Sequence, residues 1–459
     1  MDRTELAQIS HGELVELLLQ VHETLQEVRA ANCELIERVQ ELEQAAKGPP
    51  KTSKNSSSRP SADRKGKGQG GRPRAKNGAK AGHRGRSRKR SEPDVIIECK
   101  VESCGDCGAD LSQASHCELG RSQVIEIPAV EPVVVEAIRY GCHCPACGAE
   151  QVAAYPEGLE PQRVFGNRIE TIVTYLHQVQ HVSYKRLQVL LHVLFGLVVS
   201  SGALVNIARR AAAKLEPTVA EIRQNVQASA VVLSDETGAR VNGKNQWQWV
   251  FIGQEATYHV IANSRSSQVI QDVMGDAVPL VWVSDLFSAQ GKANAHLRQV
   301  CLAHQVRDLQ FAIDAERSAW AYHFRHLLFR AQRLQRRRTE LAPAHFYAAV
   351  ALIEATCDQL LSQPLHFPEE MRLQRRYLKQ RMSLFTFLYH AAVPPDNNAA
   401  ERALRNSVIH RKVSGGFRSQ TGAKDHAAVA SIVATATQKG AHPFHSLAQL
   451  IGQPTPLAP

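Results

Sequence analysis

The sequence predicts a multidomain α+β protein. A chain of 459 residues is too long for one hydrophobic core, so several domains are expected. A heptad repeat, a basic stretch, a cysteine-containing β-like segment and a helical segment follow one another, and strands mixed with helices come after them. These changes of pattern predict the domain boundaries. The predicted segments are 1–46, 47–92, 93–155, 156–225, 226–304, 305–390, 391–440 and a C-terminal tail, 441–459.

Residues 1–46 are predicted to form a coiled coil. Between residues 13 and 43, apolar residues recur at alternating spacings of three and four. Asn32 takes an a position, where a single Asn usually fixes the register of a parallel dimer. An amphipathic helix packed on its own domain is the alternative, although the stretch that follows offers it no neighbouring core. We therefore expect a homodimer or a higher oligomer.

Residues 47–92 are predicted to be a disordered basic linker. From Lys47 to Arg90 there are sixteen Lys and Arg residues and one acidic residue, Asp63, which gives this stretch a charge of +15. Because the whole chain carries +11, the remainder carries about −4. Positive charge concentrated in this way indicates contact with a polyanion such as DNA. Within it, residues 71–74 (Gly-Arg-Pro-Arg) are similar to an AT-hook.

No secretory signal and no membrane span are expected. The chain begins without an apolar stretch that could act as a signal. The longest uncharged run, residues 187–208, contains a turn between Gly196 and Gly202, so it fits two short helices better than one span. A cytoplasmic location with reduced thiols follows. The ten cysteines are then metal ligands or buried thiols before they are disulfides.

Residues 93–155 are predicted to form a zinc ribbon. Two C-x2-C turns, each followed by Gly, flank short β-like runs at 124–127 and 133–135. Such a turn presents two thiolates to one tetrahedral ion, and the Gly permits its tight backbone. Cys142 remains open as a replacement for Cys144. The expected ligands of a structural Zn²⁺ are Cys104, Cys107, Cys144 and Cys147.

Residues 156–225 are predicted to be helical and to bind DNA. The second of three helices begins after a Ser183 cap and ends at Phe195, and the third runs from Ser200 or Ser201 to Leu215, where Pro217 stops it. Two short helices joined by a glycine-containing turn resemble a helix-turn-helix. The residues expected to read bases are Asn206, Arg209 and Arg210.

Residues 226–304 are predicted to begin a layered α/β domain. Three strands, a helix and a fourth strand are expected, over 230–235, 246–251, 257–262, 266–274 and 280–285. An antiparallel meander followed by a helix and a buried strand is the beginning of a ribonuclease-H-like fold. The Arg-rich residues 305–390 are predicted to be a helical insertion, after which residues 391–440 complete the domain.

Three carboxylates are expected at the edge of this domain. Asp235 and Asp285 each follow an apolar run, and Glu401 lies just inside a helix opened by residues 394–398. A single Asp at a strand end is more often a turn former. Together, however, the three make an oxygen cage for two Mg²⁺ (or Mn²⁺) ions about 4 Å apart, which can cleave a phosphodiester. Asp235 is expected to bridge the ions, with Asp285 and Glu401 each completing one side.

Four segments resemble the transposases of the insertion sequence 66 family. They are SDETGARVNGKNQWQWVF around Asp235, VWVSDLF at Asp285, CLAH at residues 301–304, and PPDNNAAERALRNSVIHRKVSGGF around Glu401. The order of the upstream segments is similar too. In one departure, Leu286-Phe287 stands where the family commonly has an aromatic pair.

The resemblance implies a DDE-type transposase with the acidic triad Asp235, Asp285 and Glu401. Such an enzyme binds the terminal inverted repeats of an insertion sequence. Mg²⁺ activates water to cut the element ends, and the freed 3′-hydroxyl then attacks target DNA. The resemblance also implies a bacterial, nucleoid-associated location and small accessory transposition proteins.

Further side chains near the carboxylates are expected to contact double-stranded DNA. His304, in the C-x2-H motif, is expected to contact a phosphate or a flanking base, with a structural histidine as the alternative. Cations of the acidic helix are expected to contact phosphates, with a solvated basic face as the alternative. These cations are Arg402, Arg405, Arg411 and Lys412.

Two other functions remain open on the sequence alone. In a DNA-binding regulator, the N-terminal segments would do everything and the C-terminal domain would only assemble. A junction-resolving or hydrolytic nuclease would use the same fold and carboxylates without joining strands. Asp235→Asn separates the first from a transposase, because only a transposase would lose cleavage and joining, and a strand-joining assay separates the second.

Overall fold

The structure is a computed structural model that describes residues 88–161 and 163–452, with further single positions and short runs between Ser10 and Leu35. The predicted basic linker and its AT-hook-like motif therefore fall almost wholly outside the described residues, as does most of the predicted coiled coil. Within the coiled-coil segment, the described positions from Gly12 to Leu35 are helical. The described residues divide into two units. The larger unit includes residues 135–189 and 199–452, and the smaller unit consists of residues 88–134 and 190–198.

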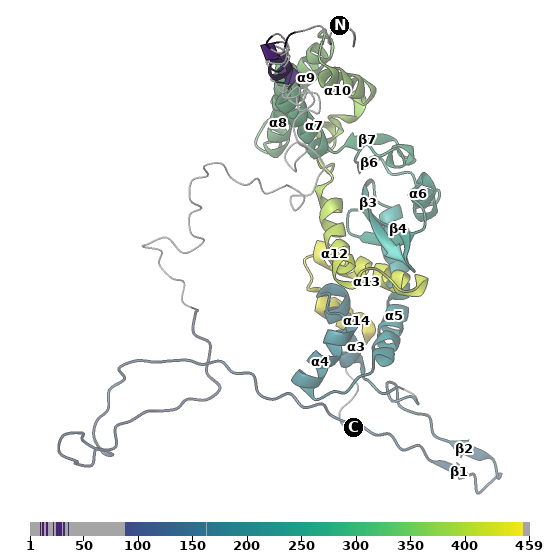
Figure 1. Cartoon of the computed structure of the whole chain (residues 1–459). Helices are drawn as coiled ribbons and strands as arrows, with labels where there is room; N and C mark the ends of the chain where they lie inside the picture. Colours follow the sequence, from purple (N-terminus) through teal and green to yellow (C-terminus); the bar gives the residue numbers. More distant parts are fainter. Residues whose placement is uncertain are drawn as a thin grey trace. The chain divides into compact units, whose positions relative to one another are not determined.

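A mixed five-stranded sheet lies at the centre of the larger unit (Figure 1). Its strands stand in the order β5-β4-β3-β6-β7. The first three in sequence form an antiparallel meander, and β6 and β7 are parallel to β3. The predicted strand and helix order is confirmed, and β7 is an additional strand. The elements are β3 (Val231–Val241), β4 (Lys244–Ile252), β5 (Thr257–Ala262), α6 (Ser267–Met274), β6 (Val281–Ser284), η3 (Gln290–Lys292) and β7 (Leu297–Val300).

The hairpin between β3 and β4 makes β3 longer than predicted. Asn242 and Gly243 both have positive φ, 51° and 72°, which is the two-residue turn that matches the twist of paired strands. The prediction that β3 ends at Asp235 is therefore wrong, because β4 pairs with β3 as far as Val241. By contrast, β6 pairs with β3 only up to Leu233. Beyond Leu233, no described strand pairs with the β6 side of β3, which is bridged only at its end, where Val241 pairs with Phe417.

Alternate residues of the strands face two hydrophobic cores. Leu233 and Val283 belong to the core shared with the helical insertion and α12 (Asn398–Ser414). Val232 and Trp282 belong to the core on the opposite face, which is shared with α6 and three further helices: α5 (Ser201–Gln227), α13 (Gln420–Gln438) and α14 (Pro443–Ile451). Because side chains alternate along a strand, Asp235 lies on the face of Leu233 and Glu236 on the face of Val232.

The helices before the sheet are α3 (Asn167–Thr174), η2 (Tyr175–Val179), α4 (Tyr184–Phe195) and α5 (Ser201–Gln227). The predicted α4 is confirmed, and the Ser200 hydroxyl caps α5 by accepting from the N–H of Ala203 at 3.1 Å. The prediction that Pro217 stops α5 is wrong, since Pro217 lies inside this helix. Ile222 and Val226 in its second half are buried against the sheet. That burial offsets the hydrogen bond lost at proline.

The predicted helical insertion is confirmed. Its helices gather beyond the β6–β7 side of the sheet (Figure 1). Aromatic side chains of Trp320, Phe324 and Tyr377 stack in its interior. The helices are α7 (Leu302–Glu316), α8 (Ala319–Arg336), α9 (Pro343–Leu361), α10 (Pro368–Lys379), η4 (Arg381–Ser383) and α11 (Thr386–Tyr389).

Three helices follow the insertion: α12 (Asn398–Ser414), α13 (Gln420–Gln438) and α14 (Pro443–Ile451). On α13, the hydroxyls of Ser431 and Thr435 accept hydrogen bonds from N–H groups of β5, which covers this sheet edge. Residues 441–459 were expected to be a tail. Instead, α14 packs with Leu447 fully buried in the core.

The cysteine-containing segment has less strand than predicted. β1 (Gly141–His143) pairs antiparallel with β2 (Glu150–Val152) around the second C-x2-C turn. The β-like runs at 124–127 and 133–135 are described and form neither helix nor strand. They lie exposed for most of their length, so no core supports pairing there.

Among the residues that the structure describes, no helix has both the length and the apolar content needed to cross a lipid bilayer.

Candidate active site

Asn397 joins the start of α12 to the open edge of β3. Where β6 stops pairing, the Ser234 carbonyl loses a strand partner, and the side-chain amide of Asn397 donates to it at 2.8 Å. The Asn397 N–H donates to the Cys301 sulfur at 3.2 Å. Asn397 is buried, so these bonds satisfy groups that water cannot reach. They hold α12, and with it Glu401, beside Asp235.

The three predicted acidic residues are brought together. Burial and the neighbouring charge of Glu236, with further contributions from Asp285 and Glu401, raise the pKa of Asp235 to about 8. Asp285 and Glu401 are thus near enough to Asp235 for their charges to act on it. We call Asp235, Asp285 and Glu401 the carboxylate cluster; they are contributed by β3, the residue after β6, and the first turn of α12.

Glu236 is a fourth carboxylate near this cluster, on the other face of β3. Burial, opposed by hydrogen bonds and reinforced by Asp285, raises its pKa. Gln290 donates to its Oε2 at 2.9 Å and Arg265 to its Oε1 at 2.8 Å. Arg265 also lies over the Phe287 ring, 3.9 Å from the centroid. Because Glu236 has protein partners at both oxygens, its side chain is held in place beside the site.

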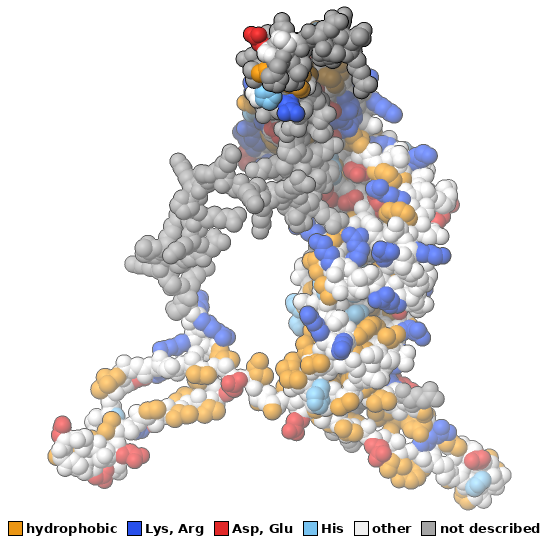
Figure 2. All heavy atoms as spheres, in the orientation of Figure 1, with side chains coloured by type: hydrophobic (Ala, Val, Ile, Leu, Met, Phe, Trp, Pro, Cys, Tyr) orange, Lys and Arg blue, Asp and Glu red, His pale blue; other side chains and the backbone are white. Residues whose placement is uncertain are grey.

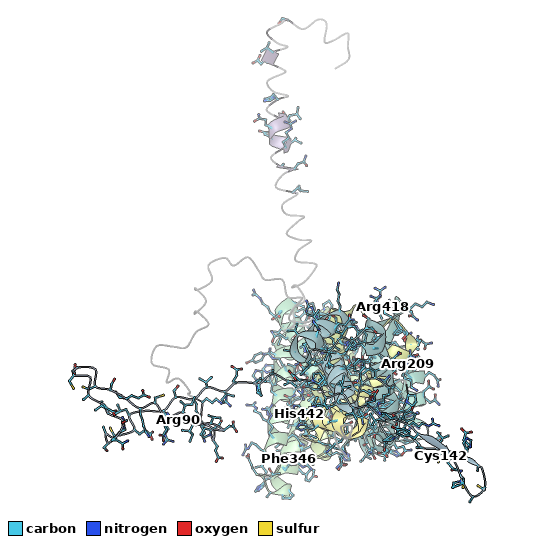
Figure 3. The ribbon with its side chains drawn as sticks, turned by 90° about the horizontal axis from the view of Figure 1, so that it is seen from below. Arg90, Cys142, Arg209, Phe346, Arg418 and His442 are labelled. Carbon is cyan, nitrogen blue, oxygen red and sulfur yellow. The ribbon has the colours of Figure 1, made fainter. Side chains whose placement is uncertain are left out.

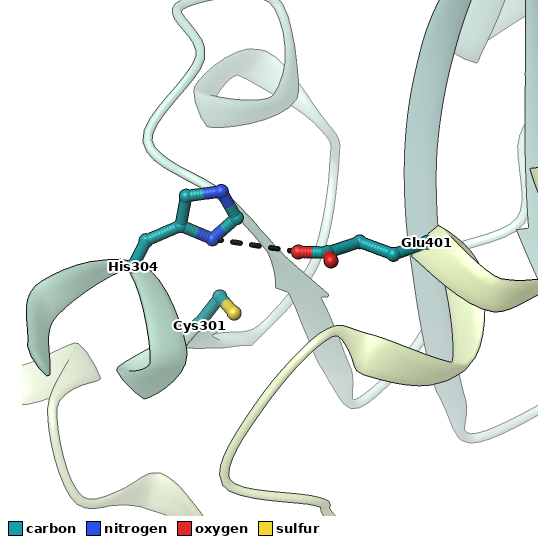
Figure 4. Close-up of side chains that lie close together, drawn as sticks. All are labelled: Cys301, His304 and Glu401. Atoms are coloured by element: carbon teal, nitrogen blue, oxygen red, sulfur yellow. Dashed lines mark ion pairs between the residues drawn. The ribbon is translucent and has the colours of Figure 1, made fainter. Parts of the chain in front are cut away.

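Glu401 faces two basic side chains of α7. Its Oε1 lies 3.8 Å from His304 Nδ1 and 3.8 Å from Arg307 Nη2, both beyond hydrogen-bonding distance (Figure 4). Neither Glu401 Oε1 nor His304 Nδ1, both buried atoms, has a hydrogen-bond partner among the described residues. One ligand atom from each of Cys301, His304 and Glu401 lies within 4.8 Å of the others. Glu401 thus lies between the sheet carboxylates and the start of α7.

The cations of α12 divide by exposure. Arg402, Arg405 and Lys412 are exposed and share one face of the helix, since they are separated by three and seven residues. Arg411 is partly buried, and its guanidinium lies close to Gly238 of β3. On the visible face of the molecule, Lys and Arg side chains gather over α12 and α13 (Figure 2).

The three α5 residues expected to read bases also divide. Asn206 and Arg209 are exposed, whereas Arg210 donates to Glu170 Oε1 at 2.9 Å. Glu170 is fully buried and also pairs with Arg163 and Lys214. A buried carboxylate needs such partners, so Arg210 joins α5 to α3. Arg210 thus has an internal ion-pair partner, which would compete with the DNA contact expected of it.

The two cysteine turns share one backbone geometry. The N–H of Gly108 donates to the Cys104 carbonyl at 2.9 Å, and that of Gly148 to the Cys144 carbonyl at 2.8 Å. Both glycines have positive φ, near 75°. Backbone N–H groups inside each turn lower the pKa of its first cysteine. Each turn by itself is thus shaped to hold a thiolate.

Histidines buried beside α12 were not foreseen. His410 of α12 stacks on His426 of α13, with ring centroids 4.5 Å apart, and lies 5.5 Å from His177 of η2. Burial and neighbouring histidines lower the pKa of His410 to about 3, so this ring is neutral at pH 7. The rings therefore act as packing that holds α12 against its neighbours.

Sequence reasoning missed Arg307, Asn397 and Glu236 near the carboxylates. Arg307 follows His304 by three residues, so the helical spacing could have placed it on the same face. Glu236 directly follows Asp235 in the sequence. Because side chains alternate along a strand, however, its carboxyl is expected on the opposite face of β3, away from Asp235. Nothing in the sequence indicates that the Asn397 amide reaches β3.

Comparison with known proteins bears on this arrangement of carboxylates. No curated protein matches the chain. The family model described as Transposase IS66 family matches residues 162–425, more than half of the chain. The chain belongs to the IS66 transposase family. The matched range begins just before α3 and ends within α13, so it contains the sheet, the helical insertion and all three carboxylates. A transposase domain of the IS66 family is thus the part of the chain in which the acidic cluster lies.

Proposed function

We propose that the chain is a DNA transposase that cuts the ends of an insertion sequence and joins them to target DNA, using two divalent metal ions at Asp235, Asp285 and Glu401. The observation that carries the proposal is where the three carboxylates stand: Asp235 lies on β3, Asp285 directly follows the neighbouring β6, and Glu401 lies on α12, which Asn397 ties to β3 at Ser234. The strand order, 3-2-1-4-5 when numbered from β3, supports a ribonuclease-H-like fold for this domain.

The residues fit a pair of hard cations such as Mg²⁺ or Mn²⁺. Oxygen ligands are what these ions prefer, and clustered carboxylates without a counterion raise each other's pKa. Glu401 Oε1 is buried without a hydrogen-bond partner, as expected for an oxygen kept for another ligand. When bound, the ions would activate the attacking oxygen and stabilise the leaving one.

The protein's own residues would position these groups. Asp235 on β3 would lie between the ions, with Asp285 and Glu401 on either side. Asn397 holds α12 against β3, so it fixes where Glu401 stands. Glu236 would keep the local potential negative through its carboxylate beside Asp285. His304 is placed beside Glu401 on the first turn of α7, where it would contact a DNA phosphate near the cut.

DNA would bind along the exposed cations. Arg402, Arg405 and Lys412 continue along α12 from Glu401, which suits a phosphate backbone leaving the site. Arg411 would contribute less, because it is partly buried. Asn206 and Arg209 on α5 would read the element ends as part of a helix-turn-helix.

The N-terminal segments would supply assembly and further DNA contacts. A Zn²⁺ held by Cys104, Cys107, Cys144 and Cys147 is supported by the shared geometry of the two turns. That geometry favours Cys144 over Cys142, because Cys142 lies in β1 (Figure 3). The coiled coil would pair two chains, and the basic linker would bind phosphates. Accessory transposition proteins would join this assembly.

Asp235→Asn tests the proposal, since it removes one charge with little change of volume. Purified variant and wild-type chains would be assayed with DNA carrying the element ends and Mg²⁺. We expect end binding to persist while cleavage, and joining of pre-cut ends, fall by at least about 10³-fold. Unchanged cleavage in the variant would overturn the role of Asp235, end binding without any cleavage in the wild type would support a regulator, and cleavage without joining in the wild type would support a nuclease.

A further inference from the structure

Cys301, His304 and Glu401 form a cluster with more than oxygen ligands. Cys301 precedes α7, His304 lies in the first turn of that helix, and Glu401 approaches from α12 (Figure 4). The sulfur, one imidazole nitrogen and one carboxylate oxygen lie within 4.8 Å of one another. Three donors of these kinds at that spacing can reach a common ion with side-chain adjustments of up to about an ångström, since donors around Zn²⁺ stand about 3.3–3.7 Å apart.

Two of the donor atoms are left unsatisfied. His304 Nδ1 and Glu401 Oε1 are buried and face each other at 3.8 Å, with no hydrogen-bond partner among the described residues. Buried polar atoms without partners are rare in folded proteins, and an unoccupied ion site is one reason for them. The Cys301 sulfur accepts from the Asn397 N–H, as metal-bound sulfurs commonly do.

The donor set selects the kind of ion. Sulfur and imidazole favour a borderline-soft ion such as Zn²⁺, whereas Mg²⁺ prefers oxygen alone. Three protein ligands leave a fourth tetrahedral position, which water or a DNA phosphate could take. Arg307 also lies 3.8 Å from Glu401 Oε1, and as a cation it would weaken binding until it turned toward solvent. The site is therefore suited to moderate rather than very tight binding.

We propose that Cys301, His304 and Glu401 bind one Zn²⁺ beside the carboxylate cluster, and that this ion competes with the catalytic metals for Glu401. Zinc would then act as an inhibitor of the domain. This zinc is separate from the one proposed for the paired cysteine turns. Its binding does not depend on the proposed function, whereas its inhibitory effect does.

Zinc content of the full-length chain tests the site directly. Wild type, Cys301→Ala and His304→Ala would be stripped with a chelator, reloaded with Zn²⁺, desalted and measured by atomic absorption. We expect each variant to hold one equivalent of zinc fewer than wild type. His304 is partly exposed, so its variant preserves the test if Cys301→Ala fails to fold. Zinc content equal to wild type in both variants would overturn the proposal.

Two further variants sharpen the comparison. Cys357→Ala removes another fully buried thiol, in α9, and should leave the zinc content unchanged. If Cys357→Ala also lost one equivalent of zinc, removal of any buried thiol would lower the zinc content, which would contradict the proposal. Arg307→Ala removes the opposing cation and should tighten the second zinc several-fold in a competition titration. Weaker binding in that variant would contradict the geometry.

Inhibition is measured with strand cleavage in millimolar Mg²⁺. Added micromolar Zn²⁺ should suppress cleavage by wild type at least ten-fold more than cleavage by Cys301→Ala, each relative to its own rate without zinc. Equal suppression would contradict competition at Glu401. If wild type does not cleave at all, the proposed function fails, while the zinc-content measurement still decides the site.

Discussion

The carboxylate cluster and the N-terminal half of α5 differ in how their polar residues are used. In the sheet region, all three expected carboxylates lie near one another, and the charges of Asp285 and Glu401 contribute to the raised pKa of Asp235. On α5, the expected residues divide between the surface and an internal ion pair with Glu170. The place of a residue along a strand follows from the local sequence pattern. The exposure of a residue on a helix depends instead on which distant segments pack against that helix. An Arg near the start of a DNA-binding helix is therefore weaker evidence of contact than a carboxylate at a strand's unpaired end.

The largest expected effect concerns the carboxylate cluster. Asp285→Asn and Glu401→Gln should each lower strand cleavage at least about 10³-fold, because each removes a metal ligand. The matched control is Glu236→Gln, whose carboxylate lies beside the cluster but already has Arg265 and Gln290 as partners. Glu236→Gln should lower strand cleavage only about ten-fold. Equal losses for Glu236→Gln and Glu401→Gln in a single-turnover cleavage assay would show that nearby charge, not ligation, matters.

On the α5 side, the largest effect should be on stability. Glu170→Ala leaves Arg163, Arg210 and Lys214 without their shared buried partner, and should lower the free energy of unfolding by about 3–5 kcal/mol. Glu216→Ala breaks an exposed pair with Lys424 and should have no measurable effect. Urea titration followed by circular dichroism measures both. A small effect at Glu170 would mean that Arg210 is available for DNA after all.

The cluster should also make metal-free stability depend on pH. The pKa of Asp235 is about 8 when folded and about 3.9 when unfolded, so the folded state holds more protons between these values. Stability contributed by this group is therefore present at low pH and is lost as pH rises toward 8, by up to about 1.4 kcal/mol per unit.

Asp235→Asn removes this pH dependence. At pH 8 without metal, the melting temperature of the variant should be at least about 2 °C above that of wild type. At pH 5 this difference in melting temperature should be smaller. Mg²⁺ should stabilise wild type more than the variant at pH 8. Thermal melts at the two pH values, with and without Mg²⁺, provide the comparison. A gap that is the same at both pH values would indicate that Asp235 does not carry the raised pKa.

The smallest effect separates Arg209 from Arg210. Arg209→Ala should weaken binding to element ends several-fold and reduce the slope of log K against log salt by about one. Arg210→Ala should lower the melting temperature and leave that slope unchanged. Fluorescence anisotropy across a salt series measures the slopes. The reverse pattern would restore Arg210 to the DNA-binding face.

Much of the fold could be predicted because its signals are local. The alternation in 246–251, the apolar run before Asp285 and the caps of α4 located their elements to within about two residues, and the apolar run before Asp235 located the start of β3 but not its end. The length of α5 could not be foreseen, since burial of Ile222 and Val226 outweighs Pro217. β7 is short and only half-buried along its four residues, so it has little pattern of its own.

The candidate metal ligands could be predicted from the sequence, but the residues that hold these ligands in position could not. Asp235, Asp285 and Glu401 each carry a local signal, and the family resemblance supplied their combination. The Asn397 bond to the Ser234 carbonyl joins residues 163 positions apart, so it exists only after the chain has folded. The same holds for Arg307, which becomes relevant because α12 brings Glu401 to it.

Electron paramagnetic resonance of Mn²⁺ tests the central claim most directly. The wild-type chain would be mixed with element-end DNA and two equivalents of Mn²⁺, in addition to any Zn²⁺ that it already holds. Its spectrum should show two magnetically coupled Mn²⁺ ions about 4 Å apart. Asp235→Asn should lose the coupled signal. Uncoupled ions in the wild type, or an unchanged coupled pair in Asp235→Asn, would contradict a two-metal site bridged by Asp235.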